Sequence, residues 1–142
     1  VGFNQNLRLD CCSLFAPQRF FVLLRNGRKV IAYGTHAGAL VWRMVPVSGR
    51  ENADAPESAC LLGLTGFTRH ILQGRMTSDY HDHENVEQVY YIIRGCGKML
   101  IDDEEYAVTA GDAVHLPPKT KHQLINDGED EIEHLIISTK VE

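Results

Sequence analysis

The chain has 142 residues, of which 44% are hydrophobic and 23% charged. These values are typical of one globular domain, and no apolar run approaches the ~20 residues that a helix needs to cross a bilayer, so we expect no membrane partner. The net charge of −5 is uneven: residues 1–50 carry seven Lys or Arg and one acid, and the remainder carries seven Lys or Arg and eighteen acids. Because the basic residues are spread among apolar ones, we predict no nucleic-acid partner and expect this segment to pack on an acidic barrel, its own or that of a second copy.

The first part of the chain predicts a hairpin and a further strand. Phe20–Leu24 and Lys29–Tyr33 are rich in residues that favour strands, and Asn26-Gly27 between them favours a tight turn. Ala39–Val45 predicts another strand. Residues 48–59 contain Gly, Asn, Asp, Pro and Ser and predict a surface loop.

From residue 66 onward, short strand-like runs alternate with turns. The predicted strands are Phe67–Leu72, Gln88–Arg94, Lys98–Ile101, Tyr106–Thr109, Ala113–Leu116, Lys121–Ile125 and Ile132–Ser138. Their regular spacing, without a long helical period, favours a β-sandwich or a barrel. A closed or two-sheet arrangement would also hide the strand edges.

Four cysteines bear on the compartment. Cys11, Cys12, Cys60 and Cys96 include no Cys-x-x-Cys pair, and adjacent cysteines are strained as a direct bridge. We therefore expect reduced thiols in a cytoplasmic protein.

The segment Tyr80-His81-Asp82-His83 is the most informative one. Residues two apart on a strand point to the same face, so both imidazoles can reach one metal ion. Such a pair alone is weak evidence because chance also produces it. Two further features strengthen it, namely Glu87-Gln88 at the start of the next strand and His122 about forty residues after His83.

These histidines fall into two spaced motifs. His81, His83 and Gly95 fit the pattern G-x5-H-x-H-x(3,4)-E-x6-G, with Gly74 one residue further upstream than the pattern allows. The pattern G-x5-P-x-G-x2-H-x3-N is matched at Gly111, Pro117, His122 and Asn126, with Lys119 in place of its middle glycine. Together the two motifs, over about residues 70–139, resemble those of the cupin superfamily, in particular its small single-domain conserved barrels.

The resemblance implies an all-β double-stranded β-helix, or jelly-roll barrel, with an N-terminal β-hairpin extension. We expect one domain in which residues 66–142 form the core barrel and residues 1–65 form an arm whose strands join it. The resemblance also implies one divalent transition metal ion (Mn, Fe, Ni, Zn or Cu) bound by His81, His83, His122 and a fourth side chain.

The fourth ligand is Gln88 or Glu87. Counting from His83 permits Glu87, whereas counting back from Gly95 gives Gln88, which matches the second acid of the family's frequent E-E-x-Y-Y-V-L-E-G run. We favour Gln88. Alternation along the strand then places Tyr90 on the same inner face, where a phenol can act as a catalytic acid or base.

Arg75 precedes His81 by an even step and is the predicted substrate-binding residue, because a guanidinium suits a carboxylate. The remaining histidines are not predicted ligands. His115 lies on a strand before Pro117 and is expected to line the core, whereas three others lack a matching partner spacing and are expected to be structural or exposed, namely His36, His70 and His134.

Two functions are compatible with this pattern. The first is a metal-dependent enzyme that isomerises, eliminates from or oxygenates a small oxygen-rich metabolite, such as a keto acid, hydroxy acid or sugar acid. The second is a non-catalytic module that binds a metal or a small ligand, or acts as a sensor. Since small cupins commonly pair, we expect a homodimer.

Overall fold

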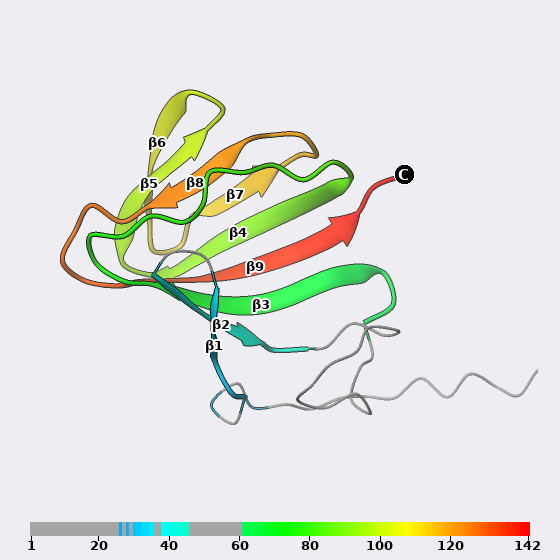
Figure 1. Cartoon of the computed structure of the whole chain (residues 1–142), viewed down its shortest axis with the longest axis horizontal. Coiled ribbons are helices and arrows are strands. Elements are labelled where there is room, and N and C mark those ends of the chain that lie inside the picture. The colour runs from blue at the N-terminus through cyan, green and yellow to red at the C-terminus, as the bar shows by residue number, and fades with distance from the viewer. Residues whose placement is uncertain (1–25, 27, 29, 36–37, 46–60) are drawn as a thin grey trace, which may run out of the picture.

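The computed structural model describes residues 26, 28, 30–35, 38–45 and 61–142. Within this part the chain forms nine strands and no α-helix, so none of it could cross a membrane as a helix (Figure 1). The strands are β1 (Tyr33–Thr35), β2 (Ala39–Arg43), β3 (Leu64–Leu72), β4 (Val86–Arg94), β5 (Cys96–Ile101), β6 (Glu104–Thr109), β7 (Ala113–Leu116), β8 (His122–Ile125) and β9 (Ile132–Lys140).

The strands form two antiparallel sheets. The larger has the order β1-β2-β3-β9-β4-β7, and the smaller has the order β6-β5-β8. In β9, buried and half-buried residues alternate over its first five positions, which is the pattern of a strand with one face on the core. The predicted jelly-roll fold is confirmed.

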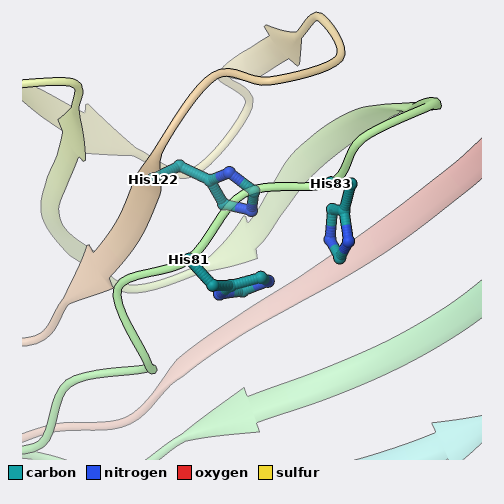
Figure 2. Close-up of side chains that lie close together, drawn as sticks. All are labelled: His81, His83 and His122. Carbon is teal, nitrogen blue, oxygen red and sulfur yellow. The ribbon is translucent and has the colours of Figure 1, made fainter.

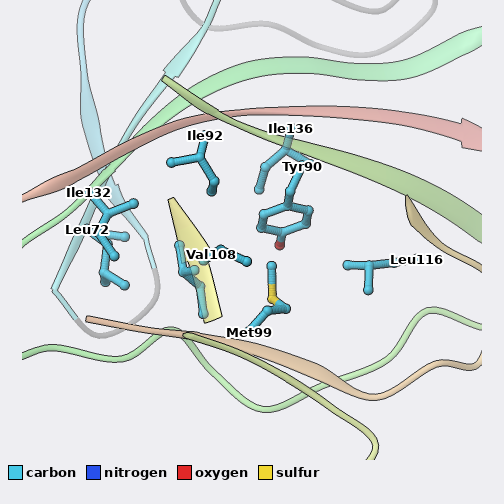
Figure 3. Close-up of a cluster of buried hydrophobic side chains, with 10 residues drawn as sticks. Leu72, Tyr90, Ile92, Met99, Val108, Leu116, Ile132 and Ile136 are labelled. Atoms are coloured by element: carbon cyan, nitrogen blue, oxygen red, sulfur yellow. The ribbon is translucent and has the colours of Figure 1, made fainter. Parts of the chain in front are cut away.

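A hydrophobic core lies between the two sheets (Figure 3). Ile92 and Ile132 of the larger sheet and Met99 and Leu124 of the smaller one are at most 1% exposed. Burying each such side chain contributes roughly 1.5–3 kcal/mol relative to leaving it in water. This apolar contact holds the sheets together and fixes the strands that carry the site.

Most strands lie within two or three residues of their predicted bounds. The exception is the predicted strand Lys29–Tyr33, because Val30 to Ala32 lie outside any strand and β1 begins at Tyr33. The observed N-terminal hairpin is β1 with β2, and it extends the larger sheet beyond β3. The predicted strand Phe20–Leu24 and Gly27 of the predicted turn lie outside the described residues, and the domain boundary at residue 65 stays a prediction.

Asn126, the last residue of the second motif, joins the end of β3 to the turn before β9. Its side chain is buried, and its amide Nδ2 donates to the carbonyls of Leu72 (3.2 Å), Gln73 (3.0 Å) and Asp130 (2.7 Å). Its Oδ1 accepts a hydrogen bond of 3.2 Å from the backbone N–H of Gly128. The motif asparagine is therefore a structural residue that ties two chain segments together.

Candidate metal centre

Backbone pairing brings His81 and His122 together. His81 forms an isolated antiparallel bridge with His122, and the two exchange backbone hydrogen bonds of 3.2 and 2.8 Å. Residues directly opposite in such a pair project their side chains to the same face. The extended segment before β4 thus lies against the start of β8 and places the two imidazoles side by side.

His83 completes a cluster of three imidazoles. One ring nitrogen from each of His81, His83 and His122 lies within 4.8 Å of the others, and the three rings point toward a common centre (Figure 2). The cluster is therefore a potential metal-binding site, since neutral imidazole nitrogens are common ligands of transition metals.

Backbone carbonyls set the tautomers of two of these rings. Nδ1 of His81 lies 3.0 Å from the carbonyl oxygen of Asp79, and Nδ1 of His122 lies 2.9 Å from that of Thr120. A carbonyl can only accept a hydrogen bond, so Nδ1 is the donor, and in the neutral ring the lone pair then lies on Nε2. This outer-shell arrangement is the one that orients metal-binding histidines.

Burial also favours the neutral form of His122. Its side chain is 1% exposed, and this burial lowers the pKa of the imidazole below its usual value. Its Nε2 is buried without a hydrogen-bond partner in the described structure. A buried polar atom without a partner is rare, and a bound metal ion would satisfy it.

Lys119, which replaces the motif glycine, has a left-handed backbone with φ of 65°. A side chain is disfavoured in this conformation, which explains why the motif has glycine at this position. The backbone N–H of Lys119 donates to the carbonyl of His83 (2.8 Å), and its Nζ lies 2.9 Å from Glu84. The turn therefore still holds the loop that carries His83.

Gln88 and Glu87 lie on opposite faces of β4. Gln88 lines the cavity beside the three histidines; its Nε2 donates to Ser138 Oγ at 3.2 Å, and its buried Oε1 has no partner among the described residues. Glu87 points outward, where Oε2 lies 3.1 Å from Nε2 of the exposed His115. Gln88 thus faces the cavity and Glu87 does not, and metal binding by Gln88 stays a prediction.

Tyr90 lies two residues further along the same face of β4. It is 5% exposed, and its ring is stacked on His134 of β9 at 5.4 Å and meets His122 edge-on at 5.9 Å. Burial raises the pKa of the Tyr90 phenol, so the group stays protonated. His134 is in turn stacked on His70 of β3 at 5.2 Å. These two histidines line the cavity, which their spacing in the sequence did not indicate.

The cavity has a volume of about 480 Å³ and is lined mainly by residues of β1, β2, β3, β4 and β9; Ser78, His81, His83 and Leu124 of β8 also line it. Among the described residues that line the cavity, Arg43 of β2 is the one Lys or Arg. Sequence reasoning missed this residue. The sequence did contain a signal for it: Arg43 is two residues from Val41 and four from Ala39, so it shares their face of the strand.

Arg75 lies elsewhere. It is exposed in a turn, has a positive φ of 61°, and forms an ion pair with Glu129. This turn breaks the strand alternation on which the predicted inner-face position depended, and Arg75 is not among the residues that line the cavity. Its role in substrate binding stays a prediction.

One relative matches part of this chain in sequence. An uncharacterized protein of Methanocaldococcus jannaschii is 44% identical over 48 residues, which are 34% of this chain and 38% of that protein. The match thus spans well under half of the relative's length.

Three solved structures have a similar fold. A predicted oxalate decarboxylase of Thermotoga maritima superposes with a TM-score of 0.69 at 16% identity, over 84% of this chain and all of that one. KdgF of a Halomonas species gives 0.66 at 14%, over 86% and 97% of the two chains, and the polyketide cyclase RemF of Streptomyces resistomycificus gives 0.68 at 15%, over 84% and 80%. At these identities the likeness shows the fold alone.

The family model of the cupin domain matches residues 67–138, which carry both histidine motifs. Since the matched residues make up half of the chain, this protein is a member of the cupin domain family.

Proposed function

We propose that this protein binds one divalent transition metal ion through His81, His83 and His122, with Gln88 as the fourth ligand. The observation that carries the proposal is the convergence of three imidazoles at a cavity wall, where Nε2 of His122 and Oε1 of Gln88 are buried without partners. Both are atom types that bind metals, so the residues present fit the ion. Mn, Fe, Ni, Zn and Cu all accept such a donor set.

We further propose an enzyme that acts on a small oxygen-rich metabolite. When bound by four neutral side chains, the ion keeps its full double charge and polarises a ligand oxygen as a Lewis acid. This favours isomerisation or elimination over oxygenation, for which a carboxylate ligand in place of Gln88 would be better suited. The fold does not select the reaction, since proteins of one fold host unrelated chemistries.

Tyr90 is the proposed catalytic residue of this chain. Its ring is held between His134 and His122, Tyr90 is among the residues that line the cavity, and burial keeps its phenol protonated. A positioned phenol can donate a hydrogen bond to a ligand oxygen and pass it a proton as that oxygen gains charge. Tyr90→Phe keeps the packing and removes only this hydroxyl, so turnover should fall while metal content stays unchanged.

The test is elemental analysis of protein purified without chelator. We expect about one transition metal ion per chain in the wild type, and loss of that ion in His81→Ala and in His122→Ala, because an incomplete ligand set binds poorly. His115→Ala is the matched control, since His115 lies on the outer face and should keep the ion. Absence of metal in the wild type even after reconstitution, or its retention in both site variants, would refute the proposal.

Turnover separates the enzyme from a binding module. A panel of small keto, hydroxy and sugar acids is supplied to the metal-loaded wild type, with oxygen uptake recorded for the Fe(II) form. Binding of an acid without any product would favour the non-catalytic alternative.

We also propose a homodimer in the cytoplasm. The outer face of the larger sheet exposes large apolar side chains, among them Leu40, Tyr91 and Ile93 at about 40% exposure each. A second copy packed there would cover them. Light scattering at micromolar concentration should give twice the 15.9 kDa of the chain, and a monomer mass would contradict the pairing.

A further inference from the structure

The cavity wall formed by β3 and β9 carries polar side chains that the proposed metal centre does not use. Thr68 of β3 and His134 and Ser138 of β9 all line the cavity, and the two strands are neighbours in the larger sheet (Figure 1). Thr68 is paired with Ile136, which lies between His134 and Ser138 on the same face of β9. Residues four apart on a strand are separated by roughly 13 Å, so this row suits a ligand of several carbon atoms.

Thr68 offers the cavity an acceptor. Its Oγ1 donates a hydrogen bond of 3.3 Å to the carbonyl of Ile136, and Nε2 of His70 lies 2.8 Å from the same oxygen. Since a carbonyl can only accept, the Thr68 proton is directed to Ile136, and His70 is the donor to Thr68. A hydroxyl oxygen has two lone pairs, so one of them remains for a ligand group that donates.

Ser138 offers the cavity a donor. Its Oγ accepts a hydrogen bond of 3.2 Å from Nε2 of Gln88, which leaves the serine proton for an acceptor. Gly66 is the partner of Ser138 in the β3–β9 pair, and a side chain at Gly66 would place its Cβ 3.4 Å from the serine oxygen. The glycine therefore keeps the hydroxyl open to the cavity, as a glycine within a strand does where a ligand approaches.

His134 offers its outer ring nitrogen. The side chain is 4% exposed, and its ring is held by stacking on Tyr90 and His70. Nδ1 is enclosed in the wall, without a hydrogen bond of ordinary geometry among the described residues, whereas Nε2 lies further from the backbone, on the part of the ring that an inward-pointing residue presents to the cavity. Burial lowers the pKa of His134 to about 4, against the smaller and opposite effect of the Ile132 carbonyl, so the ring is neutral at physiological pH.

We propose that this wall binds the adjacent hydroxyl groups of a sugar or a sugar acid, with Thr68, His134 and Ser138 as its contacts. A hydroxyl both donates and accepts, so neighbouring hydroxyls can satisfy the Thr68 lone pair, the Ser138 proton and the neutral imidazole together, whereas a carboxylate can only accept. The volume of about 480 Å³ lies within the range of small-molecule pockets. The inference rests on the proposed function, because it names the ligand class of the same cavity, but these contacts need no metal ion.

The test uses metal-free protein, prepared with chelator. The probes are glucose, galactose, mannose, xylose and galacturonate, each compared with the tetrahydropyran that keeps its ring and lacks the ring hydroxyls, and Kd is obtained from the rise of Tm with probe concentration. In the wild type we expect at least one probe to bind roughly tenfold or more tightly than its tetrahydropyran, which two or three hydrogen bonds supply. Tighter binding of galacturonate than of galactose would identify the sugar acid, and the reverse would identify the neutral sugar.

His134→Leu and Thr68→Val should each lower this preference roughly three- to tenfold, the effect of losing one hydrogen bond. Gly66→Val should also lower it, by covering the Ser138 hydroxyl. His115→Leu is the matched control, because it makes the same change as His134→Leu on the exposed outer face, and it should bind the probes as the wild type does.

The proposal is overturned by the lack of any preference in the wild type, by an unchanged preference in His134→Leu and Thr68→Val, or by an equal loss in His115→Leu. If His134→Leu does not unfold cooperatively, Thr68→Val decides, since valine keeps the branched shape of threonine. Metal content of both variants, measured separately, should remain that of the wild type, because neither residue belongs to the histidine cluster. A failure of the sugar site is thus distinguishable from a failure of the metal site.

Discussion

Asn126 offers a sharp test of how the barrel is held together. Its amide satisfies three backbone carbonyls with two N–H groups, and its Oδ1 satisfies one backbone N–H, all in a buried position. Asn126→Ala removes all of these contacts. Asn126→Asp keeps the shape and the acceptor but replaces the donor by a carboxylate oxygen that faces the three carbonyls.

The magnitude follows from the hydrogen bonds lost. Two donors and one acceptor correspond to three bonds, each of which contributes about 1 kcal/mol net. We therefore expect Asn126→Ala to lower the free energy of unfolding by roughly 3 kcal/mol. Asn126→Asp should cost at least as much, because it buries a charge that has lost its favourable partners.

Urea unfolding of the metal-free variants at neutral pH measures these changes. Asn85→Ala serves as the control: Asn85 is exposed, and its replacement should change stability by no more than about 0.5 kcal/mol. If Asn126→Ala lowered the free energy of unfolding by less than about 1 kcal/mol, the Asn126 hydrogen bonds would not be needed to hold the two segments together. Wild-type stability in Asn126→Asp would show that the amide donor does not matter.

Three further predictions concern single side chains. Gln88→Ala should lower metal content strongly, whereas Glu87→Ala, on the outer face, should keep it, and the reverse result in elemental analysis would place the ligand at Glu87. Lys119→Gly should raise the urea unfolding free energy by about 1 kcal/mol by removing the left-handed strain, and a destabilised variant would contradict this. The pKa of His134 falls from 6.5 to about 4 on folding, so its stabilising contribution is complete above pH 6.5 and is lost as the pH falls toward 4. This loss amounts to about 3 kcal/mol, and His134→Leu should remove it from the pH profile of unfolding.

The strands from β3 onward could be predicted nearly to their ends from local sequence. Ala113–Leu116, for example, is bounded by a Gly-Asp turn before it and by two prolines after it, and these residues decide where a strand can start and stop. Val30 to Ala32 are β-branched or small and equally suited to a strand, yet the strand starts at Tyr33. Local propensity does not determine which residues find a partner strand, because pairing depends on the rest of the sheet.

The residues of the candidate site likewise differ in whether local sequence or strand pairing determines their position. His81 and His83 could be predicted to share a site because residues two apart in an extended segment point the same way, and Gln88 because counting back from Gly95 sets its register. Arg43, His70 and His134 were missed because they meet through the register of three strands that lie far apart in the sequence. Arg75 was predicted inward because the positive φ that turns it outward cannot be read from a run of residue types.

The position of β9 bears on how this barrel is made. Of the nine described strands β9 is the last along the chain, yet it lies between β3 and β4 in the larger sheet. During synthesis, the edges of β3 and β4 that pair with β9 therefore stay unpaired until residues 132–140 have emerged from the ribosome. Open edges of apolar strands pair readily with other chains. Premature termination before residue 132 should accordingly leave an aggregating fragment, and early contact with a chaperone would protect nascent chains up to that point.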